Sequence, residues 1–125
     1  MTAHGTITWN ELNSWDPDGA MRFYGEALGW TFEAMPMPGG TYWLIFSDGN
    51  RVGGLFPLTE PDFEGVPSHW LTYIEADNVD ARVDRALAAG GSLMRPPFDV
   101  PGVGRIAIVC APGGEVMGWM QSVAE

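Results

Sequence analysis

The chain has 125 residues, of which 46% are hydrophobic and 18% are charged, with six Trp and six Phe among them. This composition is typical of one packed globular domain and excludes a disordered chain. Sixteen acidic against six basic residues give a formal net charge of −10. Because this charge repels phosphate backbones and anionic lipids, we expect no nucleic-acid partner and no membrane partner.

The compartment follows from what the sequence lacks. It has no apolar stretch of the roughly 18 to 20 residues that a membrane-spanning helix needs, and residues 1–8 lack the basic and apolar segments of a secretory signal. Cys110 is the single cysteine and cannot form an internal disulfide, which is typical of a reducing compartment. We therefore predict a cytoplasmic protein, with Cys110 as a buried apolar side chain.

The first half of the chain predicts a strand, a helix and three further strands. Asp16 can cap the helix while Pro17 takes its first position, where a missing N–H costs nothing. Gly29 ends the helix. Its buried face is predicted from apolar residues at helical spacing, namely Phe23, Ala27 and Leu28. The four strands are expected at residues 7–12, 31–34, 42–47 and 52–57, with a hairpin turn at 47–50.

The second half repeats this order after a join rich in Pro, Gly and acidic residues. Asp77 is the comparable helix cap, and Gly90 ends the second helix. The apolar face of this helix is predicted from Val79, Val83, Ala86 and Leu87. Strands are expected at residues 70–75, 92–95, 105–110 and 115–121, with a turn at 111–114.

The two halves are copies of one pattern. A shift of 61 residues places Trp9 on Trp70 and Gly29 on Gly90, and a shift of 64 places residues 48–56 on 112–120. Such a repeat determines architecture more firmly than local propensity does. We predict an α+β fold in which residues 1–125 form one domain of two tandem βαβββ modules, whose curved mixed sheets surround a cup. The first module spans residues 5–58, the linker 59–67 and the second module 68–122.

The doubled order resembles a known family. The segments that carry the resemblance are Trp9-Asn10-Glu11-Leu12, residues 16–30 with Phe23-Tyr24 and Leu28-Gly29-Trp30, residues 70–91, and Ala111-Pro112-Gly113-Gly114 with the strand after it. Together they resemble the vicinal oxygen chelate superfamily, which includes glyoxalase I, extradiol dioxygenases and bleomycin or fosfomycin resistance proteins. The start at Trp9 is also similar to an actinobacterial glyoxalase-like subgroup. The resemblance covers nearly the whole chain and implies the scaffold, whereas the chemistry must be argued from the site.

Metal-dependent members of this superfamily place four His, Glu or Gln ligands on the first and last strands of the modules. The resemblance puts these positions on Trp9, on Trp70 or Leu71, on Gly54 and on Gly118. None of these side chains donates an electron pair to a metal, and a catalytic site usually has three protein donors. Glu11, His69 and Glu115 lie near these positions in shifted registers but do not form such a set. We therefore predict a cup without a metal and without another cofactor.

The predicted lining of the cup is aromatic and apolar. Its members are Trp9, Trp43 or Tyr42, Phe46, Leu55 or Phe56, Trp70, Tyr73, and Met117 or Trp119, with Gly54 and Gly118 making room for a ligand. Flat rings stack on planar molecules, so the first hypothesis is a protein that binds a small planar hydrophobic or aromatic ligand. The superfamily's paired modules also imply a homodimer, in which a partner covers the exposed sheet edges.

Glu11 is the residue singled out for chemistry. It shares a strand face with Trp9, and burial there would raise the pKa of its carboxyl and suit it to general acid or base catalysis. The competing interpretation is a structural carboxylate, bonded to the backbone or to Asn13. The alternative functions are a metal-independent isomerase, lyase or cyclase that uses Glu11, and a divalent-metal lyase or dioxygenase. The sequence does not decide whether any reaction is catalysed.

Overall fold

A computed structural model describes residues 3–123, and every predicted helix and strand is present in it. Within that range neither helix is long and apolar enough to cross a membrane. In chain order the elements are β1 (Ile7–Ser14), α1 (Pro17–Leu28), β2 (Thr31–Met37), β3 (Gly40–Ser47), β4 (Asn50–Pro57), β5 (His69–Glu75), α2 (Val79–Ala88), β6 (Ser92–Val100), β7 (Gly104–Cys110) and β8 (Val116–Ser122).

The chain forms two compact units. The first contains residues 9–71, and the second contains residues 72–123 together with residues 3–8. The start of the chain joins the second unit because the backbone N–H groups of Gly5 and Glu75 donate to Glu75 O and Thr6 O, each at 2.8 Å. The end of the join belongs to the first unit because Ser68 Oγ accepts from the Trp15 backbone N–H at 3.0 Å. These bonds hold residues 3–8 in the second unit and Ser68 in the first.

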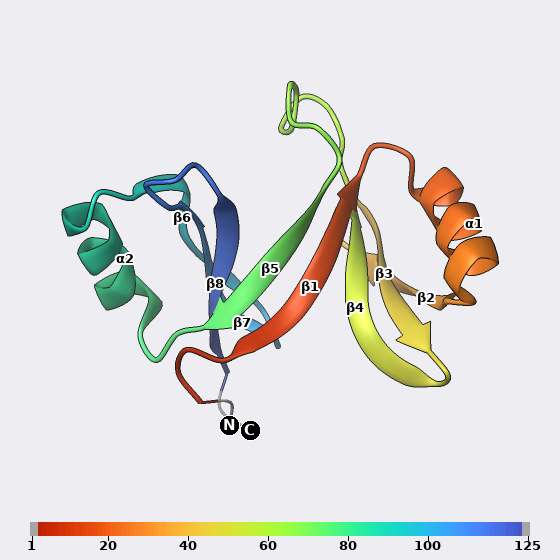
Figure 1. Ribbon diagram of the computed structural model, residues 1–125, viewed down its shortest axis with the longest axis horizontal. Helices are drawn as coiled ribbons and strands as arrows, with labels where there is room; N and C mark the ends of the chain where they lie inside the picture. The colour runs from red at the N-terminus through yellow and green to blue at the C-terminus, as the bar shows by residue number, and fades with distance from the viewer. Residues whose placement is uncertain (1–2, 124–125) are drawn as a thin grey trace. The chain divides into compact units, whose positions relative to one another are not determined.

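The first unit is a mixed four-stranded sheet with one helix on it (Figure 1). The strand order is β2-β3-β4-β1, with β1 parallel to β4 and the other pairs antiparallel. Its core is made of Leu12, Ile45 and Leu55. The side chains packed against that core come from α1, β2, β3 and the loop after α1: Ala20, Met21, Tyr24, Trp30, Phe32 and Trp43. We call this face the helix side of the sheet, and the opposite face its far side.

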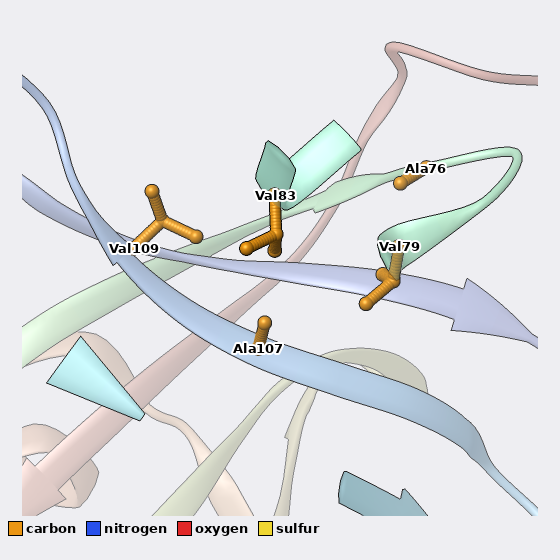
Figure 2. Close-up of a cluster of buried hydrophobic side chains, with 5 residues drawn as sticks. All are labelled: Ala76, Val79, Val83, Ala107 and Val109. Carbon is orange, nitrogen blue, oxygen red and sulfur yellow. The ribbon is translucent and has the colours of Figure 1, made fainter. Parts of the chain in front are cut away.

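The second unit repeats the arrangement. Its strand order is β5-β8-β7-β6, with β5 parallel to β8. Figure 2 shows Val79 and Val83 of α2 facing Ala107 and Val109 of β7, with Ala76 beside them. Each half is therefore a βαβββ module, and the α+β prediction is confirmed.

The apolar face predicted for α1 is wrong. Phe23 and Leu28 are 62% and 58% exposed, while Ala20, Met21 and Tyr24 pack on the core. Both faces of α1 carry apolar residues, so periodicity alone cannot choose between them. The choice depends on how the helix is anchored to the sheet.

Capping residues define where each helix begins and ends. Asp16 Oδ1 accepts from Gly19 N at 3.0 Å as predicted, Pro17 is the first helical residue, and Gly29 has φ of 74°. The cap of α2 is Asn78, whose Oδ1 accepts from Ala81 N at 3.0 Å, and not Asp77. A capping side chain reaches the N–H three residues on, and in this helix that spacing starts at Asn78.

One substitution tests the packing of the first unit. Leu55 has no exposed surface, so Leu55→Ala removes buried methyl groups and leaves a cavity. We expect it to lower the free energy of unfolding by about 2 to 5 kcal/mol, measured by urea denaturation. The matched control is Leu28→Ala, which should change that free energy by less than about 0.5 kcal/mol. Equal losses in the two variants would contradict the assignment of the buried face.

Candidate functional site

A row of side chains crosses the far side of the first sheet. Glu11 on β1 is paired with Gly54 on β4, and Gly54 is paired with Leu44 on β3. Directly paired residues project to the same face of a sheet, and chain neighbours project to opposite faces. Because Leu12 packs on the helix side, Glu11 lies on the far side, where it is only 9% exposed.

Tyr42 occupies the space above Gly54. A Cβ atom on Gly54 would overlap the Tyr42 hydroxyl group, so only a glycine lets the ring lie there. The Tyr42 hydroxyl donates to Glu11 Oε2 at 2.9 Å, and Trp9 Nε1–H donates to Tyr42 Oη at 3.1 Å. Trp9, Tyr42 and Glu11 thus form a hydrogen-bonded chain across β1 and β3.

Burial and charge keep Tyr42 in its neutral form. Burial of the ring raises the pKa of Tyr42 far above its ordinary value, and the negative charge of Glu11 raises it further. The hydrogen bond from Trp9 acts in the opposite direction and is outweighed. Tyr42 therefore remains a proton donor throughout the physiological range.

The second unit uses a similar device at the equivalent place. Tyr73 on β5 is paired with Gly118 on β8. A Cβ atom on Gly118 would lie 2.5 Å from Tyr73 Cε2. In each module, a glycine of the last strand is thus covered by a tyrosine ring. The tyrosine comes from β3 in the first module and from the first strand in the second.

The structure separates the predicted site residues. Trp9, Glu11 and Gly54 come together with Tyr42 on the far side of the first sheet. Alternation along β3 places Phe46 on the same face as Tyr42. Tyr73 and Gly118 lie together in the second unit.

Two of the predicted aromatic residues lie on the helix side of the first sheet instead. Trp43 packs against the core, and Trp70 Nε1 donates to the Tyr24 hydroxyl of α1 at 3.3 Å. The Trp70 ring also meets Trp30 edge to face. The sequence left Trp43 and Tyr42 as alternatives, and the strand register selects Tyr42 for the far side.

The register also separates Leu55 from Phe56, since Leu55 belongs to the core of the first unit. It does not separate Met117 from Trp119, because they are paired with the core residues Val109 and Ala107 and lie on one face. Phe56 meets Phe63 edge to face. The Asn13 amide donates to the Glu11 backbone oxygen at 3.3 Å, whereas the Tyr42 hydroxyl donates to the Glu11 carboxylate.

The register shows which residues are paired with the two glycines. Glu11 is paired with Gly54 in the first unit, and Tyr73 is paired with Gly118 in the second. Among the described residues no three His, Cys, Asp or Glu side chains form a group that could hold a metal ion. These residues do not fit a divalent catalytic metal, which needs about three converging donors.

Two hollows lie away from the hydrogen-bonded chain. The first unit has one of about 340 Å³ on its helix side, lined by Asn10, Trp30, Ile45, Val52, Gly53 and Trp70. The second unit has one of about 670 Å³, whose lining includes the polar residues Glu75, Asp99, Arg105 and Ser122. Arg105 is engaged there by Asp80 and Asp99, and the Glu75 carboxylate accepts from Ser122 Oγ at 2.6 Å and from its backbone N–H at 2.9 Å.

Comparison with known families agrees with the doubled module. The family described as Glyoxalase/Bleomycin resistance protein/Dioxygenase superfamily matches residues 6–117. The chain belongs to this superfamily. This finding confirms the resemblance inferred from residues such as Trp9 and Gly29.

The chain is similar to two curated relatives. It is 36% identical over 120 residues to the putative glyoxylase CFP32 of Mycobacterium tuberculosis, covering 94% of this chain and 46% of that protein. It is 33% identical over 136 residues to the anthracycline biosynthesis protein DnrV of Streptomyces peucetius, covering 98% of this chain and 50% of that protein. The chain thus spans about half the length of the curated relatives it matches.

Solved structures share the fold at low identity. A methylmalonyl-CoA epimerase of Streptomyces coelicolor is 18% identical with a TM-score of 0.64, over 98% of this chain and all of that one. A hypothetical protein, BH1468 of Bacillus halodurans, is 12% identical with a TM-score of 0.68, over 97% and 96% of the two chains. At this identity the likeness concerns the fold alone.

Gly54→Ala tests the fit of Tyr42 over β4. The added methyl group overlaps the Tyr42 hydroxyl, so the ring must move and leave Glu11. We expect a loss of about 1 to 3 kcal/mol in the free energy of unfolding. Gly25→Ala is the control, because its nearest neighbour would be the Trp30 backbone oxygen at 3.6 Å. A Gly54→Ala variant as stable as the control would refute this packing.

The raised pKa of Tyr42 predicts an incomplete alkaline titration. Because burial and the Glu11 charge disfavour the phenolate, Tyr42 should stay protonated at a pH at which an ordinary tyrosine has ionised. In tyrosinate difference absorbance, Tyr42→Phe should leave the size of the absorbance change unchanged, because Tyr42 does not ionise in this range and contributes nothing to it. Glu11→Gln should move Tyr42 toward ordinary titration. A loss of ordinary amplitude in Tyr42→Phe would contradict the prediction.

Proposed function

We propose that the chain binds a small planar hydrophobic or aromatic molecule, without a metal, on the far side of its first sheet. The observation that carries this proposal is the chain of Trp9, Tyr42 and Glu11 above Gly54. It combines two flat rings with one polar anchor. Pockets for aromatic ligands are built in this way, from large apolar surfaces and a few placed polar groups.

The names of the relatives support a ligand of this kind. Two of them, DnrV and DauV of Streptomyces, are called anthracycline biosynthesis proteins. An anthracycline is a planar system of fused rings, which suits a surface that stacks through indole and phenol faces. The chain covers about half the length of these relatives. We therefore propose ligand binding alone for this chain.

We also propose that the protein is cytoplasmic and forms a homodimer. Its single cysteine, Cys110, has no partner within the chain for a disulfide, which suits a reducing compartment. In the part of the chain that the structure describes, β2 and β6 have a hydrogen-bonded neighbour on one side each. Such edge strands are places where a second copy can pair.

A metal-independent isomerase, lyase or cyclase is the second candidate. It is favoured by the burial of Glu11 and by its bond to Tyr42, because an enzyme holds a catalytic carboxylate in one orientation. A divalent-metal lyase or dioxygenase is supported less well, since the residues beside Gly54 and Gly118 supply a single carboxylate.

Binding is tested by titrating chelator-treated protein with a panel of planar aromatic compounds and following Trp fluorescence. We expect saturable quenching by some member of the panel. Trp9→Phe should weaken binding by about tenfold, because it removes a stacking surface and a donor to Tyr42. Trp70→Phe is the matched control, since Trp70 lies on the helix side.

The outcomes of this titration separate the candidates. A panel without any quenching would overturn the proposal. A larger effect of Trp70→Phe than of Trp9→Phe would indicate that the ligand binds in the hollow on the helix side instead. Binding that returns only when a divalent metal is added would favour the metal enzyme instead.

A further inference from the structure

The hollow on the helix side of the first sheet lies apart from the hydrogen-bonded chain on the far side. It has a volume of about 340 Å³. Its base is formed by Ile45, which is 1% exposed, and by Gly53, which is paired with Ile45 on the neighbouring strand. A Cβ atom on Gly53 would lie 2.6 Å from the Asn10 backbone oxygen, so β4 can approach β1 this closely only with a glycine there. The base is thus apolar and held in place by the sheet.

Two indole rings, those of Trp30 and Trp70, form walls of this hollow. Their planes lie at 81° to each other, and their centroids are 6.0 Å apart. The walls therefore make a corner rather than a flat slot. A flat ligand can stack on one wall of a corner, whereas a rounded group can touch both walls at once.

Tyr24 of α1 holds both walls in place. Its ring stacks on Trp30 at 22° and 5.3 Å, and it meets Trp70 edge to face at 5.8 Å. Its hydroxyl accepts from Trp70 Nε1–H at 3.3 Å. Trp70 is nevertheless 43% exposed, so much of its ring remains open to a ligand. The corner is formed before a ligand arrives, which reduces the cost of ordering side chains on binding.

The lining offers a ligand few partners for hydrogen bonds. Five of its six members have no side-chain acceptor and no charge: Trp30, Ile45, Val52, Gly53 and Trp70. The sixth, Asn10, already has an interaction partner. A ligand N–H group would lose its water here without a matching gain, which is costly. The hollow therefore suits a group that has no hydrogen-bonding protons.

The charge of the first unit favours a cation. Residues 9–71 contain nine acidic residues and two arginines, a formal charge of −7 with His69 neutral. The faces of indole rings are negative and attract a cation that lies within about 6 Å of the ring centroid. The lining itself has no charged residue, so it does not supply that cation.

We propose that this hollow is a second ligand site, which binds the trimethylammonium group of a free small molecule in the corner between Trp30 and Trp70. Such a group is rounded, positively charged and without N–H protons, so it meets all three conditions. The inference does not depend on the proposed function, because it concerns the other face of the sheet and a ligand of another shape.

The first experiment compares choline with two molecules that each lack one of these properties. The alcohol 3,3-dimethyl-1-butanol has the same shape without the charge, and ethanolamine has the charge but carries N–H protons. Binding is followed by NMR of the indole N–H groups in nitrogen-labelled protein, with Trp30→Phe and Trp70→Phe assigning the resonances. We expect choline to shift both resonances saturably and to bind at least about tenfold more tightly than either analogue.

Substitution of a wall tests the cause of that preference. Trp70→Leu keeps an apolar side chain but removes the ring face, so choline should bind at least about tenfold more weakly. Trp15→Leu is the matched control, because Trp15 is also an exposed tryptophan of the first unit but does not line the hollow. It should leave the choline affinity unchanged.

Val52 provides a second test that leaves both rings in place. This lining residue is exposed, so Val52→Arg adds a positive charge beside the hollow without removing a core side chain. It should weaken choline binding by roughly fivefold or more through repulsion. The neutral variant Val52→Gln should keep the choline affinity, and neither variant should change the binding of 3,3-dimethyl-1-butanol.

Four results would overturn the inference. The alcohol could bind as tightly as choline, which would indicate apolar contact alone. Ethanolamine could bind as tightly, which would indicate general attraction to an acidic surface. Trp70→Leu and Trp15→Leu could weaken choline equally, or choline could give no saturable shift. Competition by phosphatidylcholine vesicles would also overturn a free ligand and assign the site to a lipid headgroup.

The panel of planar compounds separates this site from the proposed function. Saturating choline should leave the quenching by those compounds unchanged, because the two ligands occupy opposite faces of the sheet. Displacement of a planar compound by choline would overturn the second site. A panel without any quenching would count against the proposed function and leave the choline titration to decide this inference by itself.

Discussion

A carboxylate buried within a β-sheet needs a partner, and the first module is arranged to supply one. Glu11 is 9% exposed, and the Tyr42 hydroxyl donates to it from two strands away. This contact requires a glycine on the strand between them, because any side chain at Gly54 would occupy the place of the phenol. The hydrogen bond thus links β3 to β1 across β4, where Gly54 leaves space for the Tyr42 ring.

The same constraint gives a physical meaning to the repeat. In the second module Tyr73 covers Gly118, as Tyr42 covers Gly54 in the first. Metal-dependent members of the superfamily are expected to carry ligands at such positions. At the two last-strand positions that the resemblance assigns to ligands, this chain has Gly54 and Gly118, each with a tyrosine ring above it. Each unit carries a buried acid on its first strand: Glu11 accepts from Tyr42 in the first, and Glu75 accepts from Ser122 in the second.

The helix side of the first sheet carries the hydrophobic core of the first unit. Leu12, Ile45 and Leu55 form its core under α1, and four aromatic residues of the module, Tyr24, Trp30, Phe32 and Trp43, pack around them. Trp70 joins this group through Tyr24 and Trp30. Aromatic residues alone therefore do not mark a ligand surface in this protein, since many of them stabilise the packing of the helix.

Much of the local structure could be predicted from residues whose preferences leave little choice. Asp16 and Pro17 start α1, and Gly29 ends it in the left-handed conformation. The hairpin between β3 and β4 has positive φ at Asp48 and Gly49, as a tight two-residue turn requires. These signals act over a few residues, so they can be interpreted without knowledge of the rest of the chain.

What the sequence determined by itself was the doubled order of strands and helices, the family resemblance and the poor donor set for a metal. Tertiary structure decided which face each residue occupies. A shift of one residue in a strand reverses every side chain, which is why Trp43 and Tyr42 stood as equal alternatives until the pairing of β3 with β4 separated them. The partner of Glu11 was likewise decided by pairing, because Tyr42 lies 31 residues away along the chain and only the sheet brings the two together.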